Sequence, residues 1–324
     1  MLQTRITEML GIEHPIIQGG MQWLARAELV SAVANAGAFG FLSATSCRDA
    51  DGLRDEIRRT RNLTDRPFGV NISMLPVVMP GDLTDAFIHV ACAEQVTAVE
   101  TAGRSPEPYV AKLKSAGVKL IHKAPALRFA KKAEAIGADA VTIVGFECAG
   151  FPGMDDVPSL ILLPKAAAKL SVPVIAAGGF CDGPGLVAAL ALGAEAVLMG
   201  TRFVLAAECP AHDRLKERLV AAGETDTTLI QRSIRNAVRV MHNQDARAIE
   251  AMEAQGATMD KLIPAVTSMA GKGAYLDGDV ETGLVACGQV VGRITAVKPV
   301  RQIVDDIMAK AGQTLARLGG AFAS

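Results

Sequence analysis

Between His14 and Phe203 the chain repeats one pattern of hydrophobic and polar positions. Each repeat has a short apolar run, a turn, and a longer helical stretch that often ends in Ala-Gly or Gly-Ala. The apolar runs predict eight strands, at residues 15–19, 39–43, 68–73, 98–101, 119–123, 140–144, 173–178 and 196–200. The stretches between them predict helices at residues 27–36, 49–61, 84–94, 107–116, 126–137, 159–170 and 184–192. Eight alternating units are the number that closes a (β/α)8 TIM barrel of roughly 250 residues. An open doubly wound sheet is the alternative.

The pattern breaks between about residues 211 and 286. Segments such as HDRLKERLVAAG and ARAIEAMEAQG are helical there, and no βα repeat is visible. We therefore predict an inserted helical cap at 211–286 and a barrel formed by residues 1–210 and 287–324. The last barrel helix is predicted within VRQIVDDIMAKAGQTLARL, where Ile303, Ile307, Ala311 and Leu315 share one face.

Composition and charge narrow the function classes. The 324 residues are 50% apolar, and 33 Lys and Arg against 34 Asp and Glu leave a net charge of -1 with 4% aromatic residues. Such a chain lacks the basic surface and stacking platforms that favour nucleic-acid binding or adhesion to anionic membranes. Six cysteines without a C-x-x-C spacing indicate reduced thiols and no metal site. We see neither a secretory signal nor a transmembrane segment, and we predict a cytoplasmic protein.

Three strand ends carry unusual residues, in the segments GGMQW (19–23), NIS (71–73) and HK (122–123). Active sites of (β/α)8 barrels form at the C-terminal ends of the strands, so these residues predict a ligand platform. At the fifth strand, Lys123 and His122 must point to opposite faces, and one of them enters the barrel. Lys123 is then a cation against a bound cofactor, a Schiff-base lysine, or a surface lysine whose stem covers apolar area.

The loops after the seventh and eighth strands, AAGGFCDG (176–183) and MGTRF (199–203), are rich in glycine. Barrels commonly bind phosphate at these two loops, because glycine lets backbone N–H groups approach an anion. A helix capped by Asp182 is expected to follow the first loop. We therefore predict a phosphate site at Gly178, Gly179, Gly200 and Thr201. Alternatively, these glycines only turn the chain after each strand.

The ordered motifs HPIIQGGMQW, FGVN, IHK, GFECAGFPG, AAGGFCDG, MGTRF and CGQ resemble the FMN-dependent nitronate monooxygenase family, formerly called 2-nitropropane dioxygenases. The resemblance covers nearly the whole chain, including the inserted cap. Within the family, ECAG followed by x-P-G is similar to the branch that contains bacterial NAD(P)H:quinone reductases.

The resemblance implies FMN at the barrel mouth, with the isoalloxazine near Gly20, Met21 and Gln22 and flanked by Asn71, Ser73 and Lys123. The phosphate is implied to lie on the glycine loops already named. The remaining implied contacts are Gly150, Ala177 and Gln289. A lysine about 4 Å from the flavin would stabilise its anionic reduced form by about 4 kcal/mol at an effective dielectric constant of about 20.

One position departs from the family pattern. Members often have His in an E-C-A-G-H-x-G segment beside the flavin, and this chain has Phe151 there. A general base typically contributes about 10²- to 10⁴-fold, so proton abstraction from neutral nitroalkanes should be impaired. Phe151 would contact an aromatic or acyl substrate, or fill the space of the missing imidazole.

We therefore expect an FMN-dependent oxidoreductase that reduces quinones with NADH or NADPH. A nitronate monooxygenase is the first alternative, because nitronates are already deprotonated. Reduction of an enone or enoyl thioester is the second. An enzyme of another class, a flavin-free lyase that uses Lys123 as a Schiff base, is the third.

Overall fold

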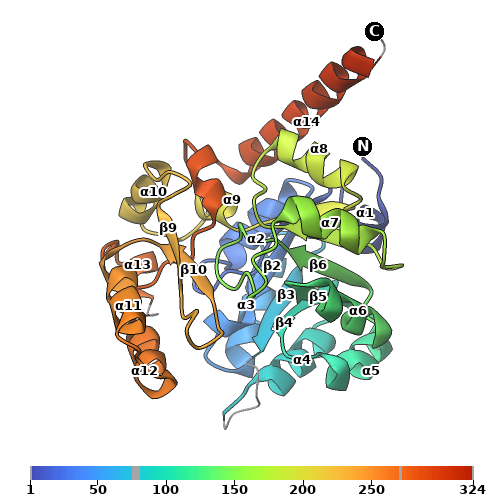
Figure 1. Ribbon diagram of the computed structural model, residues 1–324. Coiled ribbons are helices and arrows are strands. Elements are labelled where there is room, and N and C mark those ends of the chain that lie inside the picture. Colours follow the sequence, from blue (N-terminus) through green and yellow to red (C-terminus); the bar gives the residue numbers. More distant parts are fainter. Residues whose placement is uncertain (1, 75–80, 270–271, 323–324) are drawn as a thin grey trace.

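The computed structural model describes residues 2–74, 81–269 and 272–322. Eight parallel strands form a closed barrel in chain order, and β8 pairs with β1 through Met199 and Gln18. The predicted TIM barrel is therefore confirmed (Figure 1). The strands are β1 (Ile16–Gln18), β2 (Phe39–Ser43), β3 (Gly69–Met74), β4 (Ala98–Gly103), β5 (Lys119–Ala124), β6 (Ala140–Val144), β7 (Val174–Ala177) and β8 (Ala196–Met199).

Helices follow the strands and cover the outside of the barrel. They are α2 (Ala27–Asn35), α3 (Ala50–Arg61), α4 (Thr84–Ala93), α5 (Glu107–Ser115), α6 (Leu127–Ala135), α7 (Ser159–Ala167) and α8 (Gly183–Ala191). One further helix, α1 (Arg5–Leu10), has no counterpart in the sequence prediction. Its residues Ile6 and Leu10 are buried with the side chains inside the barrel, so α1 contributes to the barrel core.

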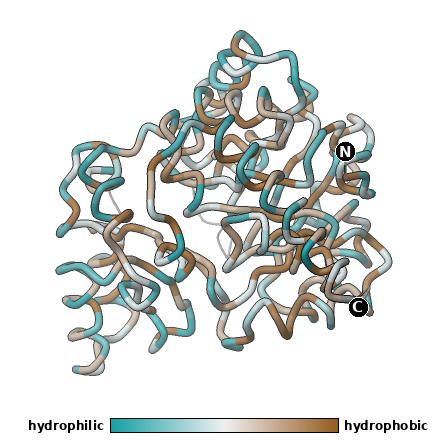
Figure 2. The backbone as a smooth tube through the Cα atoms, turned by 90° about the horizontal axis from the view of Figure 1, so that it is seen from above, coloured by the Kyte–Doolittle hydropathy of each residue, from teal (hydrophilic) through white to brown (hydrophobic). Residues whose placement is uncertain are grey.

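Alternation along the strands separates two cores. The outward side chains pack under the helices, while the inward ones form a smaller cluster inside the barrel. Phe39 and Phe41 of this inner cluster lie edge to face, with ring centroids 5.0 Å apart. Figure 2 shows hydrophobic stretches running through the barrel, with hydrophilic ones on outer turns.

On β5 the outward residue is His122, which is 4% exposed and whose Nδ1 lies 2.9 Å from Oγ1 of Thr101. Burial lowers the pKa of His122 to about 4. Because neighbouring residues on a strand alternate, Lys123 points into the barrel.

The region from 211 to 286 differs from the prediction of helices alone. It holds α10 (Asp213–Val220), α11 (Gln244–Ala254), α12 (Met259–Met269) and α13 (Gly273–Leu276), but also an antiparallel pair, β9 (Thr227–Ile230) and β10 (Val238–Met241). Strands of four residues are too short to produce a clear alternation in the sequence. This region lies at the side of the barrel (Figure 1) and has a small core of its own that includes Ile230, Ile249 and Leu262. The short helices α9 (Thr201–Val204) and η2 (Gln289–Arg293) flank it in the sequence.

The last helix, α14 (Val300–Phe322), packs against α8 and extends past the barrel (Figure 1). Ile303, Ile307 and Ala311 are buried as predicted, whereas Leu315 is 49% exposed and Leu318, further along the helix, packs against the core. Among the described residues, no helix combines the length and apolar character needed to cross a membrane.

The contact between α8 and α14 requires a glycine. A Cβ atom at Gly183 would lie 2.5 Å from the carbonyl oxygen of Ile307, so Gly183→Ala must push the two helices apart. We expect the free energy of unfolding to fall by about 1–3 kcal/mol, measured by urea denaturation. Gly312→Ala is the control, because a Cβ there meets no atom within 4 Å and α14 should gain about 0.5–1 kcal/mol. Equal effects of the two substitutions would contradict this account of the contact.

Burial of neutral His122 also predicts a pH dependence of stability. The unfolded chain binds a proton near pH 6.5 and the folded chain only near pH 4, so the unfolded state holds more protons in this window. The free energy of unfolding should therefore decrease as the pH falls from 6.5 to 4, by up to about 3 kcal/mol. His122→Asn should flatten this part of the curve in urea denaturation at several pH values. Parallel curves for the two proteins would show that His122 is not the group responsible.

Candidate active site

The barrel interior is polar toward the C-terminal ends of the strands, where several side chains surround Glu100 on β4. The Glu100 side chain is 0% exposed, and its Oε2 accepts a hydrogen bond of 2.7 Å from Nδ2 of Asn71 on β3. Nζ of Lys123 lies 3.1 Å from the same oxygen, and Oγ1 of Thr142 on β6 donates to Oε1 at 3.2 Å. A buried carboxylate is expensive unless it is paired and hydrogen-bonded, and here both oxygens have partners.

This network changes the interpretation of Lys123. The sequence leaves three roles open for Lys123: a cation against a cofactor, a Schiff-base lysine or a surface lysine. In the structure its ammonium forms an ion pair with Glu100 inside the barrel, and its side chain is 22% exposed. Ser73, which is exposed at the end of β3, extends the network by donating to Oδ1 of Asn71 at 3.3 Å. Asn71, Ser73 and Lys123 therefore belong to one connected group.

The loop after β1 lies against this network. A Cβ atom on Gly20 would lie 2.7 Å from Oδ1 of Asn71, so only glycine fits beside the amide. The side chain of Met21 lies near the loop after β8. A Cβ atom added at Gly200 would be 3.9 Å from the Met21 sulfur. Gln22 is exposed, and Trp23 has a left-handed backbone with φ 68°. Such a backbone at a non-glycine residue is a strained feature that often occurs at functional sites.

The two glycine loops occupy adjoining positions at the same end of the barrel. Gly178 and Gly179 follow Ala177, the last residue of β7, and have φ values of 91° and 84°, which favour glycine. Within the described part of the chain, the N–H groups of Gly179 and Gly200 donate to no protein acceptor. Asp182 caps α8 as predicted, by accepting from the N–H of Gly185 at 2.9 Å. These free donors and the absence of Cβ atoms fit a phosphate group.

The segment that follows residue 286 contacts both the loop after β6 and the loop after β8. The N–H of Gly288 donates to Oγ1 of Thr201 at 3.1 Å, and the N–H of Gln289 donates to the carbonyl oxygen of Glu147 at 3.0 Å. Glu147 in turn accepts hydrogen bonds from the backbone and hydroxyl of Ser159 at the start of α7. The loops after β6 and β8 are thus held in place by a third, distant part of the chain.

The loop after β6 also carries a thiol and an exposed ring. Cys148 packs against the side chains inside the barrel, and burial raises its pKa to about 12, so the thiol stays protonated at neutral pH. Phe151 in the same loop is 64% exposed.

Arg239 on β10 forms hydrogen bonds between the region from 211 to 286 and the loop after β6. The residue is 3% exposed, and it exchanges two backbone hydrogen bonds with Gly150, of 3.0 and 2.6 Å. Its guanidinium lies 4.6 Å from the ring centre of Phe146 and donates to the Phe146 carbonyl at 3.1 Å. Burial lowers the pKa of Arg239, and in the described residues no carboxylate forms an ion pair with it. The region from 211 to 286 is therefore bonded, through Arg239, to the segment that carries Cys148 and Phe151.

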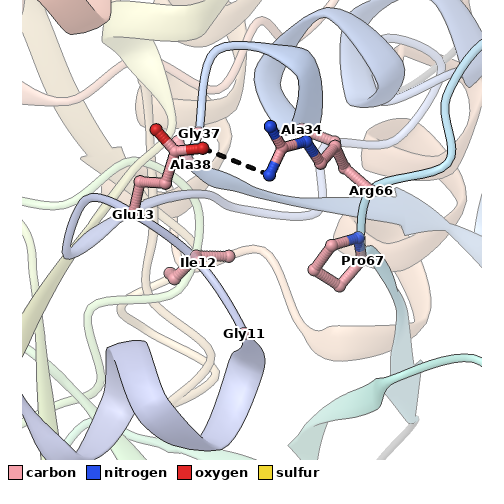
Figure 3. A pocket seen from close by; sticks show the side chains of 8 residues that line it. All are labelled: Gly11, Ile12, Glu13, Ala34, Gly37, Ala38, Arg66 and Pro67. Carbon is pink, nitrogen blue, oxygen red and sulfur yellow. Dashed lines mark ion pairs between the residues drawn. The ribbon is translucent and has the colours of Figure 1, made fainter.

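Two hollows lie at the opposite end of the barrel and do not belong to this site. The first, of about 10 Å³, is lined by residues that precede β1, β2 and β3, and the ion pair of Glu13 and Arg66 spans it at 3.1 Å (Figure 3). It has room for about one water molecule. The second, of about 440 Å³, is bordered by residues 61–68 and 95–97, which precede β3 and β4. Residues at this end of a (β/α)8 barrel usually serve stability.

Four residues of these networks are not among those predicted from the sequence: Glu100, Thr142, Glu147 and Arg239. The available signal for Glu100 was a charged residue inside the apolar strand AVET, in register with Asn71 on the neighbouring strand. Arg239 lies on a strand that the sequence did not reveal. Among the described residues, no cluster of three His, Cys, Asp or Glu side chains is arranged to hold a metal.

Comparisons with known proteins agree with this architecture. The family model of nitronate monooxygenase matches residues 3–310. A protein of Rhodococcus jostii named (3aS,4S,5R,7aS)-5-hydroxy-7a-methyl-1-oxo-octahydro-1H-indene-4-carboxyl-CoA dehydrogenase is 34% identical, over 98% of both chains. A probable nitronate monooxygenase of Staphylococcus aureus is 30% identical, over 97% of this chain and 98% of its own. The solved structure of FabK from Thermotoga maritima is 37% identical with a TM-score of 0.90, over 99% of this chain and 100% of that one. The chain belongs to the nitronate monooxygenase family and is a flavin-dependent oxidoreductase.

Proposed function

We propose that this protein binds FMN at the barrel mouth and transfers two electrons from NADH or NADPH to a quinone. The observation that supports this proposal is the chemistry of the mouth itself. It combines an ion-paired lysine and two glycine loops with free N–H donors, and it has Phe151 where relatives often carry an imidazole. Such a site can hold a flavin, but it offers no histidine base at that position.

The proposed FMN contacts follow the ring of loops around the mouth. Gly20, Met21 and Gln22 would lie along the isoalloxazine, with Asn71, Ser73 and Lys123 on its polar edge. Gly178, Gly179, Gly200 and Thr201 would hold the phosphate, because their backbone can approach an anion closely. Ala177, Gly150 and Gln289 would complete the site. When bound, FMN supplies the two-electron carrier between the nicotinamide and the acceptor.

Quinones suit this mouth because their reduction needs no side-chain base. The Cys148 thiol holds its proton at neutral pH, and Glu100 is fully buried in its network, so neither is available to remove a proton from a substrate carbon. A quinone can take its protons from water. The exposed ring of Phe151 would offer an apolar surface to a planar acceptor.

A thioester is the second candidate acceptor, and one specific observation favours it. The Rhodococcus jostii relative, 34% identical over nearly the full length, is named as a dehydrogenase of a carboxyl-CoA compound. An enone or enoyl thioester would occupy the same apolar surface beside Phe151. Nitronate oxidation is a third candidate, supported by the Staphylococcus aureus relative. The ion pair of Lys123 weakens the Schiff-base lyase alternative, because a nucleophilic lysine needs an unpaired amine.

We assign residues 211–286 to a cap over a barrel of residues 1–210 and 287–324. Support for this division comes from the separate small core of the cap and from the contact of Arg239 with the loop after β6. In this arrangement the cap would set the shape of the acceptor side of the mouth.

The first test of the proposal identifies the cofactor and its reductant. The purified protein should release FMN, identified by mass spectrometry, because the glycine loops offer a single phosphate site. Under anaerobic conditions, stopped-flow spectroscopy should show bleaching of the flavin by NADH or NADPH and its return on addition of a benzoquinone. A matched addition of an enoyl-CoA tests the second candidate. Release of FAD, or of no flavin after reconstitution, would overturn the site assignment. If the enoyl-CoA reoxidises the reduced flavin rapidly and the benzoquinone does not, the acceptor is a thioester and not a quinone.

The second test concerns Phe151. Phe151→His places an imidazole, with an ordinary pKa near 6.5, where relatives often carry it. We expect turnover of a neutral nitroalkane to rise by about 10²-fold. Turnover of a nitronate should rise less than that of the nitroalkane, and quinone reduction should change little. Phe129→His is the matched control, because Phe129 is also exposed but lies on the outer helix α6, stacked on Arg128.

Strong nitroalkane turnover by the unsubstituted protein would contradict this account and point to another base. His242 at the end of β10 would then be the first residue to replace, although its Nε2 already lies 3.1 Å from Oε2 of Glu250.

A further inference from the structure

Glu100 is the one carboxylate of the polar network described above, and the proposed function gives it no role. It pairs in register with Asn71 across β3 and β4, so both side chains point into the barrel. Oε2 accepts a hydrogen bond from Nδ2 of Asn71 and forms the ion pair with Nζ of Lys123. Oε1 accepts a hydrogen bond from Oγ1 of Thr142. No freedom of rotation remains for this side chain without the loss of several of these bonds.

The two charges of the pair lie at different depths. The side chain of Lys123 is 22% exposed and that of Glu100 is 0% exposed, so the cation faces the mouth and the anion lies beneath it. Nζ and Oε2 are 3.1 Å apart. A group bound at the mouth therefore interacts with the ammonium at short range and with the carboxylate at a distance only about 3 Å longer. Much of the attraction from Lys123 is offset at that distance.

We infer that Glu100 is a positioning residue that holds Lys123 and Asn71 toward the flavin and limits the positive charge that the flavin experiences. The inference rests on the proposed binding of FMN at this mouth. Without Glu100, Lys123 would act as an uncompensated cation beside the reduced flavin and would make the bound cofactor easier to reduce. With Glu100, the pair is neutral as a whole and the reduction potential stays lower.

The reduction potential of the bound flavin separates this role from a merely structural one. Glu100→Gln keeps the shape and an oxygen acceptor but removes the negative charge, so the two-electron potential should rise. Lys123→Gln removes the positive charge, so the potential should fall. The double variant replaces the ion pair by two neutral amides, and its potential should return close to that of the unsubstituted protein. Loss of packing alone would not give shifts of opposite sign that cancel.

The measurement is spectroelectrochemical titration of the FMN-loaded proteins at one pH. We expect each single variant to change the two-electron equilibrium at least tenfold, which corresponds to about 30 mV. Glu195→Gln is the control: it also removes one carboxylate charge, but Glu195 precedes β8 at the far end of the barrel and pairs with Arg5. Its potential should match that of the unsubstituted protein.

The double variant also protects the test against a folding failure. An unpaired buried charge strongly destabilises a protein, whereas a neutral pair of similar volume is often tolerated. Lys123→Gln leaves the fully buried Glu100 unpaired and is the variant more exposed to this failure. If only one single variant folds, the charge of Glu100 is still measured, either by Glu100→Gln against the unsubstituted protein or by Lys123→Gln against the double variant. In each comparison the protein without the Glu100 charge should have the higher potential.

The outcomes distinguish the two proposals. If the unsubstituted protein binds no FMN, the proposed function fails and no potential can be measured. If FMN binds but Glu100→Gln leaves the potential unchanged, or shifts it in the same direction as Lys123→Gln, then the proposed function stands and the inference about Glu100 is wrong.

Discussion

The carboxylate of Glu100 lies inside a closed barrel, out of reach of water, so protein groups must satisfy it. The partners come from three neighbouring strands: Asn71 from β3, Lys123 from β5 and Thr142 from β6. Asn71 is in register with Glu100, whereas Lys123 is in register with Ala102, two residues further along β4, and with Thr142 on β6, so all four side chains point into the barrel. The position of Asn71 in turn constrains the loop after β1. Asn71, held by Glu100, leaves no room for a side chain at Gly20, so the loop after β1 can pass this close to β3 only with glycine at that position.

A second constraint acts on the other side of the mouth, where the chain returns from the cap. Gly288 and Gln289 bind the loops after β8 and β6 through backbone N–H groups, and a Cβ at Gly288 would lie 3.1 Å from the carbonyl oxygen of Glu147. Arg239 binds the loop after β6 from within the cap. The loop after β6 is therefore held from two sides, by Arg239 of the inserted region and by the segment that follows that region.

The sequence predicts the barrel well because its strands and helices alternate with clear periodicity and the helices often end at glycine. It also places the glycine loops and Lys123 at the correct strand ends, since those positions follow directly from the strand order. It does not reveal the partner of Lys123, because Glu100 is 23 residues away and only the register of β3, β4 and β5 brings the charges together. The strands β9 and β10 are missed for a different reason: their four residues carry too little alternation, and Arg239 is missed with them.

Proton supply links the geometry of the mouth to the choice of acceptor. The polar groups inside the barrel satisfy one another, and the thiol of Cys148 keeps its proton because burial raises its pKa. Phe151, which the resemblance implies stands in the place of the family imidazole, is largely exposed. Protein groups at this mouth are thus suited to hold charge and orientation rather than to exchange protons with a substrate. In the proposed function an acceptor would take its protons from water, which favours acceptors whose reduced form carries its negative charge on oxygen over substrates that must first lose a proton from carbon.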